Sequence, residues 1–280
     1  MSSDTPSFAL PPELAREVEA ARGAAADRAA AARALSLLDF TSLNDDDDDG
    51  RIEAFCRRAL TPTGKVAAVC VYPAFVPTAR RVLAGTGVRV ASVANFPSGG
   101  ADAAAAADET RTAIEKGAEE VDIVFPYKAH FAGERAMAAA VVRACRKACG
   151  DEIPLKVILE TSQIADAATL AEISRIAIDE GADFLKTSTG KLGAGATLEG
   201  IAVMLDAIRS SGRRVGIKPS GGIRTTAQAA GFLALGSAMM DPDYLAPGTF
   251  RIGASSIMGD LLKTLGVTSD APSAPPPGSY

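Results

Sequence analysis

"EGADFLKT" (residues 180–187) and "KGAEEVDIVF" (residues 116–125) share the pattern that decides the fold class. In each, a helical stretch ends at a glycine, which commonly follows the last turn of a helix, and an apolar run begins almost at once. The apolar runs are short and rich in Val, Ile, Leu and Phe, which is typical of strands buried on both faces. The two segments therefore predict tight helix-to-strand connections in an alternating α/β chain.

The same alternation extends along most of the chain. We expect eight strands, at residues 35–40, 65–71, 89–95, 120–125, 154–160, 183–187, 214–219 and 250–255. Helices are expected near 50–60, 74–85, 101–117, 132–149, 165–181, 197–211, 225–235 and after 255. This order predicts a single α/β domain, a closed (β/α)8 TIM barrel. A doubly wound open sheet is the alternative, but no GxGxxG motif follows the first strand to support it.

The two ends of the chain depart from this pattern. The alanine-rich stretch 11–33 predicts an extra N-terminal helix, because Pro11 suits a first helical turn. Residues 1–10 and the Pro-rich residues 267–280 are expected to be disordered tails, and the barrel domain is expected to span 11–266.

Composition excludes several function classes. The 280 residues are 48% hydrophobic and carry a formal net charge of −5, which disfavours binding to nucleic acid or an anionic membrane. No apolar stretch approaches the ~20 residues that cross a bilayer, and the N-terminus lacks a secretory pattern. The four cysteines show no CxxC spacing, which argues against zinc and disulfides. We therefore expect a cytoplasmic protein with reduced thiols.

Polar residues gather where the expected strands end, which in TIM barrels is the active-site face. They are Asp39, Thr41, Cys70, Asn95, Asp122, Lys156, Glu160, Lys186 and Lys218. A charged side chain inside an apolar strand is costly unless it is paired. We therefore expect Lys186, Lys218 and Asp122 to converge in the barrel mouth.

Two lysines and a carboxylate in one mouth favour a specific chemistry. A free lysine has a pKa of ~10.4, but burial and a neighbouring ammonium can bring a lysine to ~7–8. A neutral amine attacks a carbonyl carbon and forms an iminium, which acts as an electron sink for carbon–carbon cleavage. We expect Lys186, Lys218 and Asp122 to be catalytic, with no cofactor and no metal.

A phosphate site is predicted beside them. Barrels often bind phosphate with the loops after their last two strands, where glycines let backbone N–H groups approach closely. The candidate residues in those loops are Gly221, Gly222, Gly253, Ser255 and Ser256. Lys191 is a plausible countercharge, and we also assign Thr41, Cys70 and Thr189 to substrate binding.

Neither the aspartate run at residues 45–49 nor the single histidine is expected to bind a ligand. The run Asp45–Asp49 lacks the alternating ligands of a calcium loop, so we expect solvated carboxylates at the start of the next helix. His130, the single histidine, is expected in a surface loop after the fourth strand.

The chain strongly resembles the deoxyribose-phosphate aldolase family over roughly residues 33–266. The resemblance is carried by "LLDFTSLNDDD", "VCVYPAFVP", "VANFPSG", "VDIVFPY", "LKVILET", "GADFLKTSTGK", "GIKPSGGIRT" and "FRIGASS". It implies a class I aldolase that reversibly cleaves 2-deoxy-D-ribose 5-phosphate to acetaldehyde and D-glyceraldehyde 3-phosphate, in deoxyribonucleotide catabolism.

The resemblance also implies residue roles. Lys186 would form the Schiff base, Lys218 would perturb it and help to move protons, and Asp122 would join the proton relay through water. The Gly-rich loops and Lys191 would bind the phosphate. Some family members end in a tyrosine that reaches the site, and Tyr280 is in this position here.

Two alternatives remain open at the level of sequence. One is another Schiff-base barrel aldolase, such as a transaldolase-like enzyme, and the other is a non-catalytic barrel that binds phosphosugars. The expected partners are a small phosphorylated sugar and aldehydes, and alanine-rich helix faces are compatible with a homodimer.

Overall fold

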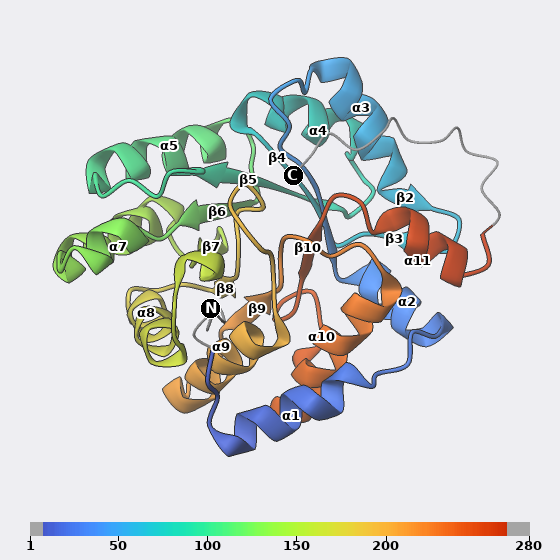
Figure 1. Ribbon diagram of the computed structural model, residues 1–280. Helices are drawn as coiled ribbons and strands as arrows, with labels where there is room; N and C mark the ends of the chain where they lie inside the picture. Colours follow the sequence, from blue (N-terminus) through green and yellow to red (C-terminus); the bar gives the residue numbers. More distant parts are fainter. Residues whose placement is uncertain (1–7, 268–280) are drawn as a thin grey trace, which may run out of the picture.

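Eight parallel strands close into a barrel in the computed structural model, which describes residues 8–267. In sheet order the strands are β10 (Ile252–Ala254), β1 (Leu38–Ser42), β4 (Ala68–Val71), β5 (Arg89–Ala94), β6 (Glu120–Val124), β7 (Leu155–Ile158), β8 (Phe184–Lys186) and β9 (Gly216–Lys218). Parallel bridges between Ile217 and Phe250 and between Ser220 and Gly253 join the two ends of this sheet. Figure 1 shows the strands at the centre of a ring of helices. The predicted (β/α)8 barrel is confirmed.

A helix follows each strand of the barrel. The helices are α3 (Asp49–Arg58), α4 (Val76–Val82), α5 (Ala103–Glu115), α7 (Arg135–Cys149), α8 (Ala167–Asp179), α9 (Leu198–Ser211), α10 (Thr226–Met239) and α11 (Met258–Thr264). Several begin at a side chain that accepts a hydrogen bond from the first turn, namely Asp48, Asp102, Asp166, Thr197 and Thr225. Such caps satisfy backbone N–H groups that have no partner within the helix, so these residues fix where the helices start.

Short elements fill the connections. They are a hairpin of β2 (Leu60–Thr61) and β3 (Gly64–Lys65), the helix α6 (Tyr127–Phe131), and the 3-10 turns η1 (Pro73–Phe75), η2 (Thr161–Gln163) and η3 (Pro242–Tyr244). The hairpin shortens the strand expected at 65–71, because Lys65 pairs with Leu60 in β3 and β4 begins only at Ala68.

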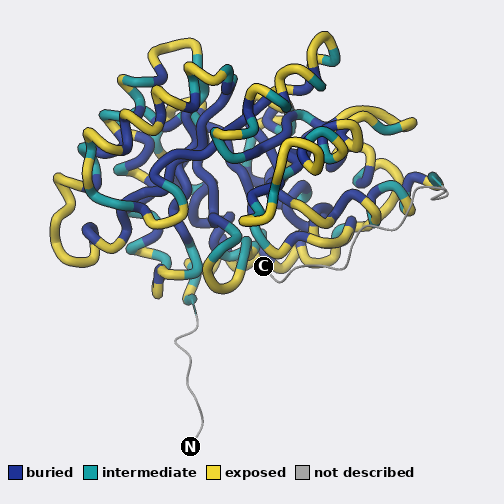
Figure 2. Tube along the Cα trace, turned by 90° about the horizontal axis from the view of Figure 1, so that it is seen from above, coloured by how far each residue is buried: buried dark blue, intermediate teal, exposed yellow. Residues whose placement is uncertain are grey.

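The strands are buried on both faces, as their composition predicts. Every residue of β4, β6 and β7 is buried, and Figure 2 shows the buried strands surrounded by partly exposed helices. Between strands and helices lies the main apolar core. Inside the barrel the apolar cluster is small, comprising Leu43, Cys70, Ala91 and Val93. The rest of the interior is therefore available for charged groups.

The single N-terminal helix predicted over 11–33 is wrong. The stretch forms two helices, α1 (Pro12–Arg22) and α2 (Arg28–Ser36). Gly23 follows the last turn of α1, and the Asp27 side chain accepts a hydrogen bond from Ala30 N to start α2. Helix α1 packs against α9 and α10, and α2 packs against α10 and α11. Because α2 runs to Ser36, β1 starts at Leu38 rather than at residue 35.

The ends of the chain are described in part. Phe8 and Leu10 pack against the core, contrary to the expected disorder of residues 1–10. Residues 1–7 and 268–280 lie outside the described part, as do the remaining tail predictions and Tyr280. Within residues 8–267, no helix combines the length and apolar character needed to span a membrane.

Candidate active site

The two predicted strand-end lysines meet at one carboxylate. Lys186 ends β8 and Lys218 ends β9, and these two residues are direct partners in the parallel register. The Nζ atoms of both lysines lie 2.8 Å from Oδ2 of Asp122, which comes from β6. All three side chains are almost fully buried. The structure thus brings together the three residues that the sequence singled out.

Strand alternation explains why these charges enter the barrel. Successive side chains of a strand point to opposite faces, so Glu120 and Asp122 share the inner face of β6. The neighbouring Val121 and Ile123 belong to the apolar core between strands and helices. A polar residue at every second position of a buried strand is therefore the signal of a charged barrel interior.

The surrounding charges fix the ionisation of Asp122 and Lys218. Burial opposes the ionisation of Asp122, but Lys156, Lys186 and Lys218 together outweigh it and hold its pKa well below the usual range. Burial alone would lower the pKa of Lys218, but Asp122 and Asp39 raise it above its usual value. Lys218 is therefore an ammonium at neutral pH and lies beside Lys186.

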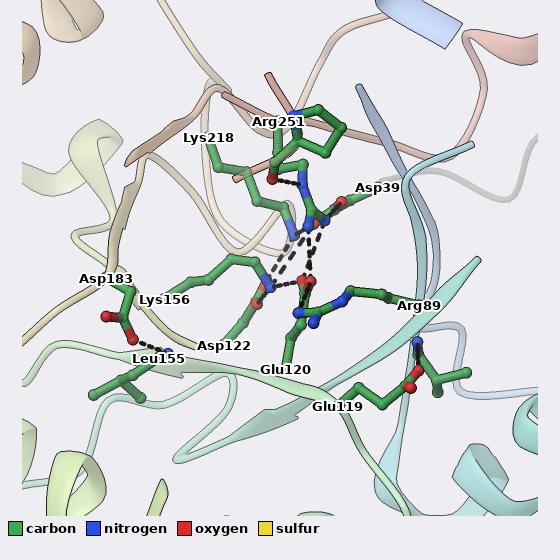
Figure 3. A network of polar contacts seen from close by, with 12 residues as sticks. Asp39, Arg89, Glu119, Glu120, Asp122, Leu155, Lys156, Asp183, Lys218 and Arg251 are labelled. Atoms are coloured by element: carbon green, nitrogen blue, oxygen red, sulfur yellow. Dashed lines mark hydrogen bonds and ion pairs between the residues drawn. The ribbon is translucent and has the colours of Figure 1, made fainter. Parts of the chain in front are cut away.

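A second set of buried charges adjoins these residues. Sequence reasoning assigned none of its members a role. It consists of Asp39, Glu120, Lys156 and Arg251. Figure 3 shows the Arg251 guanidinium between the Asp39 and Glu120 carboxylates, with the Lys156 amine turned toward Asp122. We call these four residues the floor network.

The contacts of the floor network are short. Arg251 lies 2.5 Å from Asp39 Oδ1 and 2.7 Å from Glu120 Oε1. Lys156 Nζ lies 2.6 Å from Glu120 Oε2 and 2.8 Å from Asp122 Oδ1. Lys218 Nζ lies 2.5 Å from Asp39 Oδ2, which joins the floor network to the site above it.

The floor network is stable as a set of ions. Burial disfavours each charge, but the neighbouring opposite charges lower the pKa values of Asp39 and Glu120 and raise those of Lys156 and Arg251. The sequence carried a signal for the two members not placed at strand ends. Glu120 lies two residues before Asp122, and Arg251 lies two residues before Gly253, so each shares the inward face of a strand.

The predicted phosphate loops lie against one another. Gly221 and Gly222 have φ values of 84° and 71°, which favour glycine. Ala196 N donates hydrogen bonds to the carbonyls of Ser220 and Gly221, so the loop after β8 lies on the loop after β9. A side chain at Gly195 would meet the Gly221 carbonyl, and one at Gly253 would meet Ser220 and Lys218. Close backbone packing therefore depends on these glycines.

The other residues predicted to bind phosphate are Ser255, Ser256 and Lys191, and they lie in different surroundings. Ser255 and Ser256 are exposed and precede α11, which begins at Met258 rather than directly after β10. Lys191 Nζ lies 3.6 Å from Oδ1 of Asp45, so part of the aspartate run reaches the loop after β8. Asp48 caps α3, in agreement with the expected role of the run at a helix start.

The remaining predicted substrate residues have defined partners. Thr41 Oγ1 donates to the carbonyl of Asp39 at 2.9 Å, and Thr189 Oγ1 donates to Glu160 Oε2. Cys70 is buried inside the barrel, where burial and then Asp122 raise the pKa of its thiol to about 11. Glu160 has a φ of 52° and also accepts a hydrogen bond from Thr189 N. Thr189 therefore fixes the loop after β8 through Glu160.

The expectation for His130 is wrong. His130 is buried in α6, with its Nε2 3.9 Å from Glu172 Oε2. Burial and Arg135 lower its pKa, although Glu172 opposes them. An isolated polar residue after a strand gave no sign of the short helix that buries it. Within residues 8–267, no group of three or more His, Cys, Asp or Glu side chains is arranged to hold a metal ion.

Comparisons with known proteins agree with this geometry. A model of the DeoC/LacD family of aldolases matches residues 33–240. A candidate deoxyribose-phosphate aldolase from Coccidioides immitis has a similar structure, with a TM-score of 0.75 and 28% identity over 94% of this chain and 92% of that one. The deoxyribose phosphate aldolase of Aeropyrum pernix, described as a tetramer, gives a TM-score of 0.71 and 25% identity over 89% of this chain and 97% of that one.

The family match covers most of the barrel and includes Asp39, Asp122, Lys186 and Lys218. The similar structures extend the agreement to nearly the whole length of both chains. The chain therefore belongs to the DeoC/LacD family of aldolases.

Proposed function

We propose that the protein is a class I aldolase, an aldehyde-lyase that reversibly cleaves 2-deoxy-D-ribose 5-phosphate to acetaldehyde and D-glyceraldehyde 3-phosphate. The observation that carries this proposal is the position of two lysine amines on one carboxylate oxygen, Oδ2 of Asp122. In this proposal Lys186 is the nucleophile, because Lys218 is held as an ammonium by two carboxylates.

The first half of the reaction uses the amine of Lys186. Its lone pair attacks the C1 aldehyde of the open-chain sugar and gives a carbinolamine, which loses water to form an iminium. The Lys218 ammonium opposes a second positive charge beside it, which favours the neutral amine that attack requires. It can also donate a proton to the departing hydroxyl.

The second half breaks the C2–C3 bond. The C3 hydroxyl loses its proton, the C2–C3 electron pair moves into the iminium, and glyceraldehyde 3-phosphate leaves. The resulting enamine takes a proton at C2, and water then hydrolyses the iminium to acetaldehyde and free Lys186. The low pKa of Asp122 makes it a weak base in the resting site. We therefore assign Asp122 to orienting the water that carries these protons.

The loops after β8, β9 and β10 form the proposed phosphate site. Their glycines let the loop backbones pack closely, and glycine backbone also lets N–H groups approach an anion closely. Lys191 supplies the charge in this proposal, and Gly221, Gly222, Gly253, Ser255 and Ser256 supply the loop contacts. We keep Thr41 and Cys70 as contacts to the sugar or the aldehyde.

The test is cleavage of 2-deoxy-D-ribose 5-phosphate, followed by chemical identification of both products. Formation of acetaldehyde and glyceraldehyde 3-phosphate supports the proposal. Cleavage restricted to ketose donors would indicate the transaldolase-like alternative. Binding of phosphosugars without any cleavage would indicate a non-catalytic barrel.

We further propose a cytoplasmic setting and a homodimer. Four buried free thiols support a reducing compartment. Phe131 and Met137 are large apolar side chains that are about half exposed at α6 and α7, which supports self-association. Light scattering on the purified full-length protein tests the assembly, and a monomer at micromolar concentration would contradict it.

A further inference from the structure

The buried interior of the barrel carries more positive than negative charge. Its cations are Lys156, Lys186, Lys218 and Arg251, and its carboxylates are Asp39, Glu120 and Asp122. Every one of these side chains is at most 4% exposed. If all were ionised, the set would hold one excess positive charge. An excess buried charge is costly, and loss of a proton from one amine removes it.

The three amines differ in the number of carboxylates that they contact. Lys218 lies within 2.8 Å of two carboxylates, Asp39 and Asp122. Lys156 also lies within 2.8 Å of two carboxylates, Glu120 and Asp122. Within the described residues, Lys186 has one carboxylate partner, Asp122. The ammonium of Lys186 therefore gains the least from its surroundings.

We propose that Arg251 and Glu120, the ion pair of the floor network, are positioning residues that set the pH range in which Lys186 is a neutral nucleophile. This inference rests on the proposed aldolase function and adds a residue pair that does not touch the substrate. Arg251 contributes the charge that makes the interior positive, and Glu120 limits the size of that excess.

The pair acts on Lys186 through a chain of contacts. Arg251 holds Oδ1 of Asp39, which leaves Oδ2 for Lys218. Glu120 is shared between Arg251 and Lys156, and Lys156 in turn holds Oδ1 of Asp122. Lys186 contacts the other oxygen of the same carboxylate. A change in charge at the floor is therefore felt at Lys186 by a buried, poorly screened route.

Charged or titratable groups come from most strands of the barrel that carries Lys186. They are Asp39 of β1, Cys70 of β4, Arg89 at the start of β5, Glu120 and Asp122 of β6, Lys156 of β7, Lys218 of β9 and Arg251 just before β10, with Glu160 beyond the end of β7. Arg89 is half exposed and lies 3.2 Å from Glu120. Substituting Glu120 or Arg251 alone changes one charge in this set and leaves the others in place.

The test measures the pH dependence of kcat/KM for sugar-phosphate cleavage in the full-length wild type and four variants. Glu120→Gln removes a negative charge, so the acid limb should move to lower pH by about one unit. Arg251→Met removes a positive charge, so the acid limb should move to higher pH by a similar amount. The double variant should return close to the wild-type profile, and Arg251→Lys should retain it.

A surface ion pair supplies the matched control. Arg143 of α7 and Glu180, the residue that follows α8, lie 2.6 Å apart, with Arg143 largely exposed and Glu180 partly exposed. Arg143→Met and Glu180→Gln should leave the acid limb unchanged, because solvent screens these charges. If Arg251→Met does not fold, the near-isosteric Glu120→Gln still tests the direction of the shift.

The outcomes separate this inference from the proposed function. If the wild-type protein neither cleaves the sugar phosphate nor forms an adduct at Lys186, the proposed function fails first. If it does both, but Glu120→Gln and Arg251→Met shift the acid limb in the same direction or not at all, only this inference is overturned. A purely structural role would reduce activity in both variants without opposite shifts.

Discussion

Lys186 and Lys218 lie 2.8 Å from the same oxygen, Oδ2 of Asp122, and are register partners on neighbouring strands. The arrangement makes the two amines unequal. Lys218 also contacts Asp39 at 2.5 Å, and the carboxylates raise its pKa although burial opposes them. One amine is thus held as a cation beside the other, which is one of the arrangements that can activate a nucleophilic lysine.

Replacement of the nucleophile should abolish catalysis while the fold is retained. Lys186→Ala should reduce kcat for sugar-phosphate cleavage by about 10³-fold or more, because no other amine can form the iminium in its place. Circular dichroism should show an unchanged spectrum, since Asp122 keeps Lys156 and Lys218 as partners when Lys186 is replaced. Retained cleavage above about a tenth of the wild-type rate would assign the nucleophile to another residue.

Loss of the second lysine should change the pH profile as well as the rate. Lys218→Leu removes the ammonium beside Lys186 and should move the acid limb of kcat/KM upward, with a rate loss of about 10²-fold at neutral pH. The measurement is kcat/KM from pH 5 to about 10. An unshifted profile would show that Lys218 does not influence the protonation of Lys186.

The site formed by Lys186, Lys218 and Asp122 was predictable from the sequence, because it depends only on where the strands lie and which way their side chains point. Strand alternation and the position of strand ends follow from local sequence, so the sequence alone predicts where Lys186, Lys218 and Asp122 lie. The floor network could not be predicted in the same way, because its members meet only when the barrel closes. Arg251 is paired with Asp39 and Glu120, which lie 212 and 131 residues away, and no local pattern joins residues so far apart.

Removal of the proposed phosphate charge should affect only phosphorylated substrate. Lys191→Ala should raise KM for 2-deoxy-D-ribose 5-phosphate by about 10-fold or more, as expected for one charge-assisted contact. Cleavage of unphosphorylated 2-deoxy-D-ribose should be unchanged. Lys147→Ala, an exposed lysine of α7, is the control and should alter neither substrate. Equal losses with both sugars would refute a phosphate role for Lys191.

The floor network should make stability depend on pH in acid. The pKa of Asp39 is lowered in the fold because Arg251, Lys218 and Lys156 outweigh its burial. Its contribution to stability is therefore fully present above the unfolded value of about 4 and is lost as pH falls through the lower folded value.

Asp39→Asn tests this contribution. The substitution leaves Arg251 and Lys218 underpaired, so it should lower the free energy of unfolding by about 3–5 kcal/mol at pH 7. The difference from wild type should shrink as pH falls from about 4 toward 2. Urea denaturation at several pH values measures both quantities. A difference that is constant with pH would show that Asp39 does not stabilise the fold as an ion.

Errors in the sequence predictions have local physical causes. The alanine-rich stretch 11–33 favours helix throughout, and the break depends on Gly23 ending one helix and Asp27 capping the next. The burial of His130 depends on α6, whose five residues are too few to show a helical period. In both cases the local sequence permits more than one conformation, so helical propensity alone did not decide the outcome.

The most direct test of the account is mass spectrometry of the full-length protein after incubation with acetaldehyde and borohydride. Reduction of the iminium leaves an ethyl group on the lysine that formed it. We expect one added ethyl group, mapped to Lys186, and no adduct in Lys186→Ala. An adduct on another lysine, or no adduct in a folded protein that binds sugar phosphate, would contradict it.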